Sequence, residues 1–372
     1  MNSTGPLHYG SAIALHGDTL AVGAPENTGM PGHQKGVVFV YQREGDQWAE
    51  IVELVASDKD DGFQTDLHFG DALALDADTL AVGAPEARDH EAGNGAGAVY
   101  LFRRRGSAWE ETEILHASDR TANARFGEQL VLREGVLLVS GGQAVYVFER
   151  AGAEWIEQAR LTDESMGERD RFGHSVAIDG NYVAVGAMDY DPELERYTSS
   201  AVYLFQRNGD RWVPETKLAP SEGDRPVFGI SLALQGETLA IGSGADAGGF
   251  AAGAVYIYEN GPEGWQQQAK LVPGDASFSF FTSFGSSIAL EGDLLAVGAA
   301  GDSGQGLWSG SAYLFRKQGE TWIDLQKLWP DEEDYLGAFF GRAIELSGDT
   351  LMVAAPSEYG NAVYIYEIST EH

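Results

Sequence analysis

The stretch FGDALALDADTLAVGAP at residues 69–85 decides the fold, because its pattern recurs along the whole chain. It begins with an aromatic-glycine pair, continues as an alternating run, turns, and ends in a second apolar run. The pair occurs seven times, at Tyr9-Gly10, Phe69-Gly70, Phe126-Gly127, Phe172-Gly173, Phe228-Gly229, Phe284-Gly285 and Phe340-Gly341. Successive pairs lie 60, 57, 46, 56, 56 and 56 residues apart. Such a period is typical of repeat architectures, so we interpret each copy as one structural unit.

Each unit is predicted to form four short antiparallel strands. The alternating run that the aromatic-glycine pair opens, 71–75 in the second copy, indicates strand one, because strands have a period of two. A turn with Gly, Asn or Asp follows it. Strand two, 79–85, is apolar almost throughout, which suits a strand buried on both faces. Strand three is the most regular, with AVYLF at 98–102 or a close variant in every copy.

Strand four is marked by a tryptophan and by a leucine six residues later. The six pairs are Trp48/Leu54, Trp109/Leu115, Trp155/Leu161, Trp212/Leu218, Trp265/Leu271 and Trp322/Leu328. Even spacing puts two residues of a regular strand on the same face. We therefore expect the two side chains to pack together on the neighbouring sheet.

Four strands repeated seven times predict an all-β fold, a seven-bladed β-propeller of four-stranded antiparallel blades. Residues 1–372 are expected to form one domain, with the blades beginning near the seven aromatic-glycine pairs. Only six copies have the tryptophan strand, so the last blade lacks one strand. Met1 to Leu7 could supply it; a three-stranded last blade or a truncated chain are the alternatives.

The composition excludes several classes of function. Asp and Glu number 57 against 24 Lys and Arg, and the net charge of −33 repels nucleic acid and anionic lipid. No apolar run is long enough to cross a membrane. The chain has no cysteine, which excludes disulfides, thiolate zinc sites and cysteine nucleophiles. Met1 to Leu7 lacks signal-peptide features, so either the protein is cytosolic or the chain is part of a longer, exported precursor. We favour the second alternative, a monomeric domain located outside the cell or at its surface.

The FG pairs, the GAP tripeptides at 23–25 and 83–85 and the AVYLF strands resemble FG-GAP repeats. This family includes the integrin α-subunit propeller and many bacterial secreted proteins. The resemblance implies an adhesion or carbohydrate-binding propeller. Integrin-type blades often hold calcium between strands one and two, but turns here, such as 235–237, are too short to wrap a cation that needs six to eight oxygens. We therefore expect no cofactor and do not carry over the family's calcium sites; calcium bound elsewhere is the alternative.

The long connections follow strands two and four, so they are expected at one end of the blades. Binding residues usually lie on such loops. Aromatic residues, Phe339 among them, concentrate in the loops of blades five to seven. The candidate ligand-binding residues are Phe250, Phe278, Phe280, Phe281, Trp308, Trp329, Tyr335 and Tyr359. Exposed aromatic patches often mark interaction surfaces. The alternative is that the rings form a small core beneath their own loops.

Acidic clusters are the weak metal candidates: Asp58, Asp60, Asp61 and Asp66, then Asp189, Asp191 and Glu193, and Asp331, Glu332, Glu333 and Asp334. We interpret them as solvated loops, because none fits a calcium-loop frame. The first residues of the seven inner strands are Ser11, Asp71, Glu128, His174, Ile230, Ser286 and Arg342. That set repeats no ligand residue, which disfavours a metalloenzyme at the central channel, and no catalytic motif is present.

The leading hypothesis is a non-catalytic extracellular module that binds a protein or a glycan through the face with the long loops. One alternative is a propeller hydrolase or lactonase with its site at the central channel. Another is a structural scaffold within a larger secreted protein. The fold alone does not decide among them.

Overall fold

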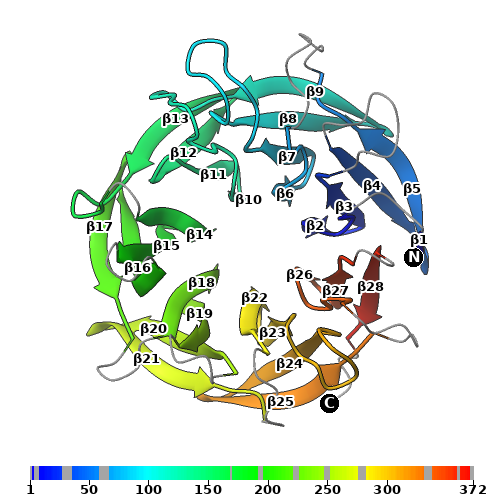
Figure 1. Ribbon diagram of the computed structural model, residues 1–372, viewed down its shortest axis with the longest axis vertical. Helices are drawn as coiled ribbons and strands as arrows, with labels where there is room; N and C mark the ends of the chain where they lie inside the picture. The colour runs from blue at the N-terminus through cyan, green and yellow to red at the C-terminus, as the bar shows by residue number, and fades with distance from the viewer. Residues whose placement is uncertain are drawn as a thin grey trace. The chain divides into compact units, whose positions relative to one another are not determined.

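The computed structural model describes residues 2–3, 8–26, 36–57, 67–167, 170–191, 196–220, 226–246, 252–274, 282–330, 337–357 and 361–368. In these ranges the regular elements are all β-strands, arranged in seven four-stranded antiparallel sheets. The predicted fold, a seven-bladed β-propeller, is confirmed; Figure 1 labels the strands blade by blade. No helix able to cross a membrane occurs in the described ranges.

The chain divides into two compact units. The N-terminal unit comprises Asn2–Thr162 with Gly360–Ala362, and the C-terminal unit comprises Asp163–Tyr359 with Val363–His372. Its organisation as one domain over residues 1–372 stays a prediction. The N-terminal unit holds blades one to three. Their strands are β2 (Ile13–His16), β3 (Thr19–Ala24), β4 (Val37–Glu44) and β5 (Gln47–Leu54); β6 (Leu73–Asp76), β7 (Thr79–Ala84), β8 (Ala98–Arg105) and β9 (Ala108–Leu115); and β10 (Leu130–Arg133), β11 (Val136–Gly141), β12 (Ala144–Ala151) and β13 (Glu154–Leu161).

The C-terminal unit holds blades four to six and most of blade seven. Their strands are β14 (Arg171–Asp179), β15 (Tyr182–Asp191), β16 (Arg196–Asn208) and β17 (Arg211–Leu218); β18 (Pro226–Gln235), β19 (Thr238–Asp246), β20 (Ala254–Gly261) and β21 (Gly264–Leu271); β22 (Phe284–Glu291), β23 (Leu294–Ala299), β24 (Ser311–Gln318) and β25 (Thr321–Leu328); and β26 (Ile344–Ser347), β27 (Thr350–Ala355) and β28 (Asn361–Glu367).

The N-terminus contributes the fourth strand of blade seven. The sheet order is β1-β28-β27-β26, where β1 is Asn2–Ser3. Asn2 pairs with Ala362 and Ser3 pairs with Asn361. Of the alternatives for the last blade, the structure therefore favours completion by the first residues of the chain, although β1 is only two residues long.

The aromatic ring of each aromatic-glycine pair is buried, as the repeat predicts. Phe69, Phe126, Phe228, Phe284 and Phe340 are fully inaccessible, and Tyr9 and Phe172 nearly so. Each ring meets aromatic side chains of strand three in its own blade edge to face; Phe69 lies 5.3 Å from Tyr100 and 6.1 Å from Phe102, between ring centroids. Such contacts fix the inner end of each blade to its third strand.

The glycines of the pair and of strand two are explained by one contact between adjacent blades. A Cβ on Gly23 of blade one would lie 2.1 Å from the carbonyl oxygen of Gly70 in blade two. Gly70 itself has φ +94°, a conformation that favours glycine. The same contact joins Gly83 to Gly127, Gly186 to Gly229, Gly242 to Gly285 and Gly298 to Gly341. The backbones of neighbouring blades therefore approach too closely for any side chain.

The expectation that the tryptophan and leucine of strand four share a face is wrong. In blade two, Trp109 pairs with Arg104 and Leu115 pairs with Val99, because a bulge at Leu101/Phe102 inserts one extra residue. An odd shift moves the tryptophan to the opposite face. Trp109 packs in the same core as Leu54 of blade one, whereas Leu115 packs in the core that contains Trp155 of blade three. The hydrophobic cores thus lie between blades.

Two further predictions need correction. In blades one, two, three and seven the aromatic-glycine pair precedes strand one instead of opening it, since β6, for example, begins at Leu73. In blade four the connection expected at 187–200 is largely a hairpin, because β15 extends to Asp191 and β16 begins at Arg196.

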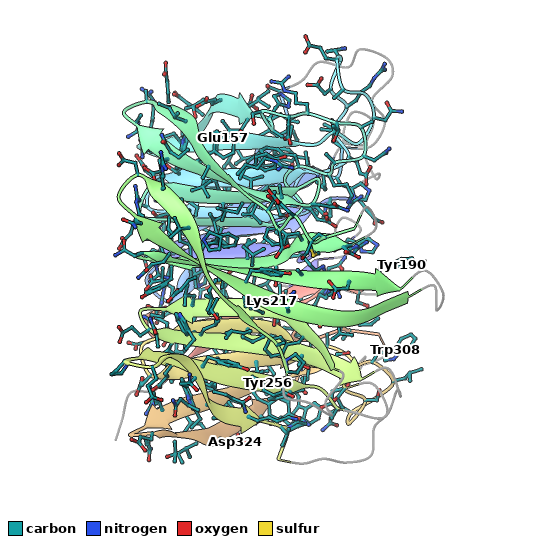
Figure 2. All side chains as sticks on the ribbon, turned by 90° about the vertical axis from the view of Figure 1, so that its left-hand side faces the viewer. Glu157, Tyr190, Lys217, Tyr256, Trp308 and Asp324 are labelled. Atoms are coloured by element: carbon teal, nitrogen blue, oxygen red, sulfur yellow. The ribbon has the colours of Figure 1, made fainter. Side chains whose placement is uncertain are left out.

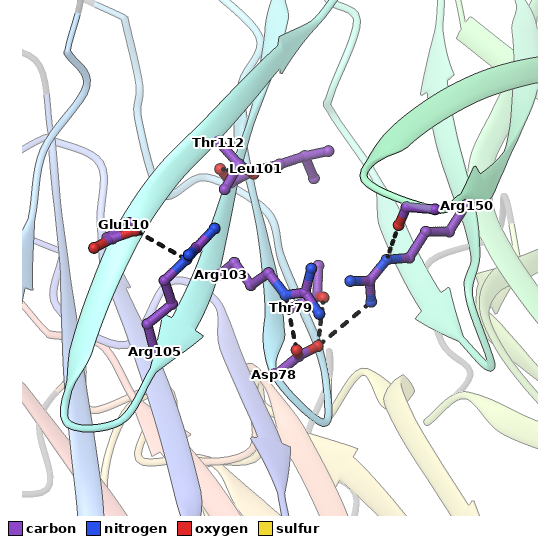
Figure 3. Close-up of polar contacts among 9 residues, drawn as sticks. Asp78, Thr79, Leu101, Arg103, Arg105, Glu110, Thr112 and Arg150 are labelled. Atoms are coloured by element: carbon purple, nitrogen blue, oxygen red, sulfur yellow. Dashed lines mark hydrogen bonds and ion pairs between the residues drawn. The ribbon is translucent and has the colours of Figure 1, made fainter.

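Polar clamps hold adjacent blades together at the end with the short turns. Asp78, between β6 and β7, accepts hydrogen bonds from Arg103 of its own blade (2.9 Å) and from Arg150 of blade three (3.5 Å) (Figure 3). Burial opposes ionisation of Asp78, but hydrogen bonds from Arg103 and Thr79 hold the pKa of this carboxyl below its ordinary value. The carboxylate is half-exposed, so this clamp contributes modestly to stability.

Candidate functional site

The long connections lie at one end of the blades within each unit. Strand order alone puts the connections after strands two and four opposite the short turns. The glycine contacts between neighbours join corresponding ends, so adjacent blades in a unit share this polarity. Figure 2 shows Trp308 and Tyr190, both of the C-terminal unit, at the same long-connection end.

Most of the aromatic candidates fall outside the described residues. These are Phe250, Phe278, Phe280, Phe281, Tyr335 and Tyr359. The structure describes Trp308 and Trp329, and the two belong to neighbouring connections of blade six. Trp308 lies between β23 and β24, and Trp329 directly follows β25.

Trp308 forms an exposed aromatic shelf with Phe339. The Trp308 side chain is 48% exposed, and its ring stacks on Phe339 with centroids 5.9 Å apart and planes 24° from parallel. Both residues have positive φ, +54° and +49°, which is uncommon for bulky side chains. Leu307 beside Trp308 is also exposed. Strained residues of this kind persist only where surrounding contacts fix them.

Hydrogen bonds supply those contacts. The Phe339 amide donates to the Trp308 carbonyl at 3.0 Å, and the Gly337 amide donates to the Leu307 carbonyl at 3.0 Å. The Trp308 amide donates to Ser303 Oγ at 3.1 Å. The loop within blade six is thereby joined to the connection between blades six and seven, and these bonds fix the backbone that carries the two stacked rings.

A buried ion pair joins the loop that carries Trp308 to β25. Asp302 is almost fully buried and lies 2.8 Å from Lys327 Nζ; it also accepts hydrogen bonds from Ser311 Oγ (2.7 Å) and the Gly304 amide (2.9 Å). Lys327 Nζ lies 4.0 Å from the centroid of the Trp329 ring. Trp329 also covers Gly304, where a Cβ would meet its ring at 2.6 Å. Trp329 is therefore partly buried and structural, while Trp308 is the exposed ring of the two.

Among the acidic candidates that the structure describes, no metal site is formed. Asp58, Asp60, Asp61, Asp66 and Glu193 lie outside the described residues, as do Asp331, Glu332, Glu333 and Asp334. Asp189 and Asp191 are on β15, where their backbones pair with Ser199 and Arg196 of β16. Within the described ranges no three His, Asp or Glu side chains are grouped in a way that could hold a metal ion.

A second polar cluster, in the N-terminal unit, was not predicted as a site. It lies beside the aromatic-glycine pairs of blades one to three, and we call it the blade 1–3 cluster. Its residues are His8, Glu26, His68, Asp71, Glu86, Arg125 and Glu128.

Ion pairs occur in the cluster within blades one and three and between blades two and three. His8 Nε2 lies 3.1 Å from Glu26, and Arg125 pairs with Glu86 of blade two and, at 3.4 Å, with Glu128. In blades one to three the residue directly before the aromatic ring has a positive φ: +62° at His8, +51° at His68 and +54° at Arg125.

Asp71 is the perturbed carboxyl of this cluster. Burial raises its pKa above the ordinary value, and the nearby Glu128 and Glu26 raise it further, against the opposing charges of His68 and Arg125. Titratable groups with pKa values pushed apart are the usual basis of acid-base pairs. Asp71 and Glu128 appeared in the sequence only as starts of inner strands. The other members of the cluster could have been found from their repeated positions in the sequence. His8, His68 and Arg125 stand two residues before the glycine of the pair, and Glu26 and Glu86 directly follow the GAP proline.

Solved structures confirm the architecture at low sequence identity. A periplasmic gluconolactonase from Pseudomonas aeruginosa matches with a TM-score of 0.52 and 14% identity, covering 97% of this chain and 89% of that one. An ulvan lyase, described as a new family of polysaccharide lyase, matches with a TM-score of 0.59 and 13% identity, covering 100% and 94%. At such identity the likeness shows the fold alone. No curated protein matches the chain.

The FG-GAP repeat family matches at residues 48–102, 155–205, 212–258 and 265–315, together more than half of the chain. Each matched segment runs from the tryptophan strand of one blade to strand three of the next. The match thus covers the elements that form a core between two blades. The chain belongs to the FG-GAP repeat family.

Proposed function

We propose that this protein is a binding module that holds a glycan or a protein ligand on the long-connection end of blades six and seven. The observation that carries the proposal is the exposed Trp308 ring, stacked on Phe339 and held by backbone hydrogen bonds. A flat, prepositioned ring suits stacking against a sugar ring, because little conformational freedom is lost on binding.

The buried pair Asp302–Lys327 supports the same proposal. It anchors the loop that displays Trp308, so ligand binding does not have to order that loop. The charge of the whole chain favours neutral or cationic ligands over nucleic acid and anionic membranes. We further propose that the module acts outside the cell or at its surface.

The test is a screen of neutral polysaccharides and glycans, followed by titration of any ligand found. Trp308→Ala should weaken binding roughly 30-fold, as expected for loss of an aromatic anchor worth about 2 kcal/mol. The matched control is Leu325→Ala, because Leu325 is similarly exposed, at 41%, but lies on β25 away from the stacked pair. Equal loss in both variants, or none in Trp308→Ala, would reject the Trp308 shelf as the binding site.

A second candidate is a hydrolase or lactonase that acts through the blade 1–3 cluster. The observation in its favour is Asp71, a partly buried carboxyl with a raised pKa beside Glu128 and Arg125. The solved structures of similar fold are named as a lactonase and a lyase, which makes sugar lactones and polysaccharides reasonable substrates to test. In this scheme Asp71 donates a proton and a neighbouring carboxylate or His8 accepts one.

Assays of lactone hydrolysis and polysaccharide cleavage between pH 4 and 9 test this candidate. Activity should fall as pH rises through the raised pKa of Asp71, because the acid must be protonated. Asp71→Asn should abolish the activity, and Asp46→Asn, in an exposed turn between β4 and β5, should leave it unchanged. Activity that survives Asp71→Asn would exclude this carboxyl as the acid.

A further inference from the structure

The backbone that carries Trp308 and Phe339 has a counterpart at the junction of blades two and three. The hydrogen bond from the Phe339 amide to the Trp308 carbonyl (3.0 Å) recurs there, from the Arg125 amide to the Gly95 carbonyl (2.9 Å). All four residues have a positive φ. Trp308 therefore occupies the place of Gly95, and Phe339 occupies the place of Arg125.

The same correspondence puts Arg342 beside the stacked rings. The Arg342 amide donates to the Phe339 carbonyl at 3.0 Å, as the Glu128 amide donates to the Arg125 carbonyl at 3.1 Å. In blade three this turn brings the two side chains together, with Arg125 Nε 3.4 Å from the Glu128 carboxylate. The matching turn in blade seven indicates that the Arg342 side chain lies next to the Phe339 ring. Arg342 is exposed.

The acidic residues near Arg125 have no acidic counterparts near Arg342. Glu86, which pairs with Arg125, stands three residues after the glycine of strand two, where blade six has Gly301. Asp71 directly follows the glycine of the aromatic pair, where blade six has Ser286. Within the described ranges no ion pair involves Arg342.

We propose that Arg342 and the Trp308 shelf together bind a sugar that carries a carboxylate, such as a uronate residue of a glycan. This inference rests on the proposed function, which assigns the shelf as the binding site, and it adds the charge of the ligand. The exposed ring would stack on the face of the sugar, while the planar guanidinium would form two parallel hydrogen bonds to the carboxylate.

The net charge of −33 limits the ligand to few negative charges at the site. Salt screens the repulsion between the ligand and distant carboxylates, because the Debye length is about 8 Å at physiological ionic strength. A guanidinium in direct contact with a carboxylate is screened much less. One carboxylate held beside a stacked sugar is thus compatible with the acidic chain, whereas the dense charge of nucleic acid is not.

The test measures binding of the full chain to tetrasaccharides of galacturonate, glucuronate and mannuronate by calorimetry. Each is compared with its carboxyl-reduced form, in which the acid is replaced by a primary alcohol. At least one uronate should bind roughly tenfold more tightly than its reduced form, because hydrogen bonds to charged groups are the stronger ones. Arg342→Gln should remove this difference by weakening uronate binding alone.

Arg211→Gln is the matched control. It changes the net charge equally, and Arg211 is exposed at the start of β17, at the end with the short turns. This variant should keep the preference for the uronate. Equal losses in Arg211→Gln and Arg342→Gln would overturn the inference, because the effect would then come from overall charge.

The remaining outcomes separate this inference from the proposed function. If the parent binds a uronate and its reduced form equally, and Trp308→Ala abolishes both, the role of Arg342 is rejected and the shelf stands. If Trp308→Ala leaves uronate binding unchanged, the shelf is rejected and this inference fails with it. Binding of reduced forms without binding of any uronate would also reject the role of Arg342.

Discussion

Glu345 on β26 is an acidic residue at a position that is apolar in every other blade. It pairs with Met352 of strand two. The residues at the same place in blades one to six are Ala14, Ala74, Val131, Ala177, Ala233 and Ala289. Burial raises the pKa of Glu345 to about 8, and the charge of Glu291 adds to the shift. Its ordinary value is 4.5.

The sign of the effect on stability follows from linkage. The folded state binds the Glu345 proton more tightly than the unfolded state does. The contribution of Glu345 to the free energy of unfolding is therefore greatest below pH 4.5 and is lost as the pH rises to about 8. A shift of this size corresponds to about 5 kcal/mol at most, at 1.36 kcal/mol per pKa unit. Because the side chain is partly exposed, solvent screening lowers this, and we expect about 1–3 kcal/mol.

Glu345→Gln removes the charge and keeps the size of the side chain. The free energy of unfolding, measured in urea at pH 5, 7 and 9, should be similar to that of the parent at pH 5. It should exceed that of the parent by about 1–3 kcal/mol at pH 9. Glu320→Gln is the control, because Glu320 is exposed in a turn and its removal changes the net charge equally. A difference between Glu345→Gln and the parent that does not vary with pH would refute the reasoning.

Two further predictions test the packing of the blades. Gly242→Ala should destabilise the protein by about 2 kcal/mol or more, because the new Cβ would lie 2.1 Å from the carbonyl oxygen of Gly285. Gly261→Ala, with nothing within 4 Å, is its control, and equal midpoints in thermal unfolding would contradict the contact. Phe172→Ala should cost about 3–5 kcal/mol, because the ring is buried edge to face against Tyr203 at 5.4 Å. A denaturation midpoint unchanged from the parent would show that this ring does not anchor blade four.

The fold was predictable from the sequence because each blade repeats the same strand and glycine signals. The face of Trp109 was not, since spacing along the chain does not show the bulge beside Leu101. Only the pairing register reveals that the extra residue moves the tryptophan to the other side of the sheet. Repetition therefore predicts which strands form, while their register requires the structure.

The candidate site was predictable in part. Trp308 stood out as an aromatic residue in a long loop, and the structure shows its ring exposed. The different role of Trp329 was not predictable, because its ring packs against Gly304, which is distant in sequence, as well as near Lys327. The blade 1–3 cluster was missed for the same reason: Glu86 and Arg125 are 39 residues apart and meet only across two blades.

The close approach of Gly23 to Gly70 has a consequence for how such chains can change in length. Each of these contacts is made by two successive repeats and involves backbone atoms alone, so it is independent of the side chains on either blade. A duplicated or deleted repeat would therefore find a matching neighbour at the new junction. Substitution of either glycine would affect two blades at once.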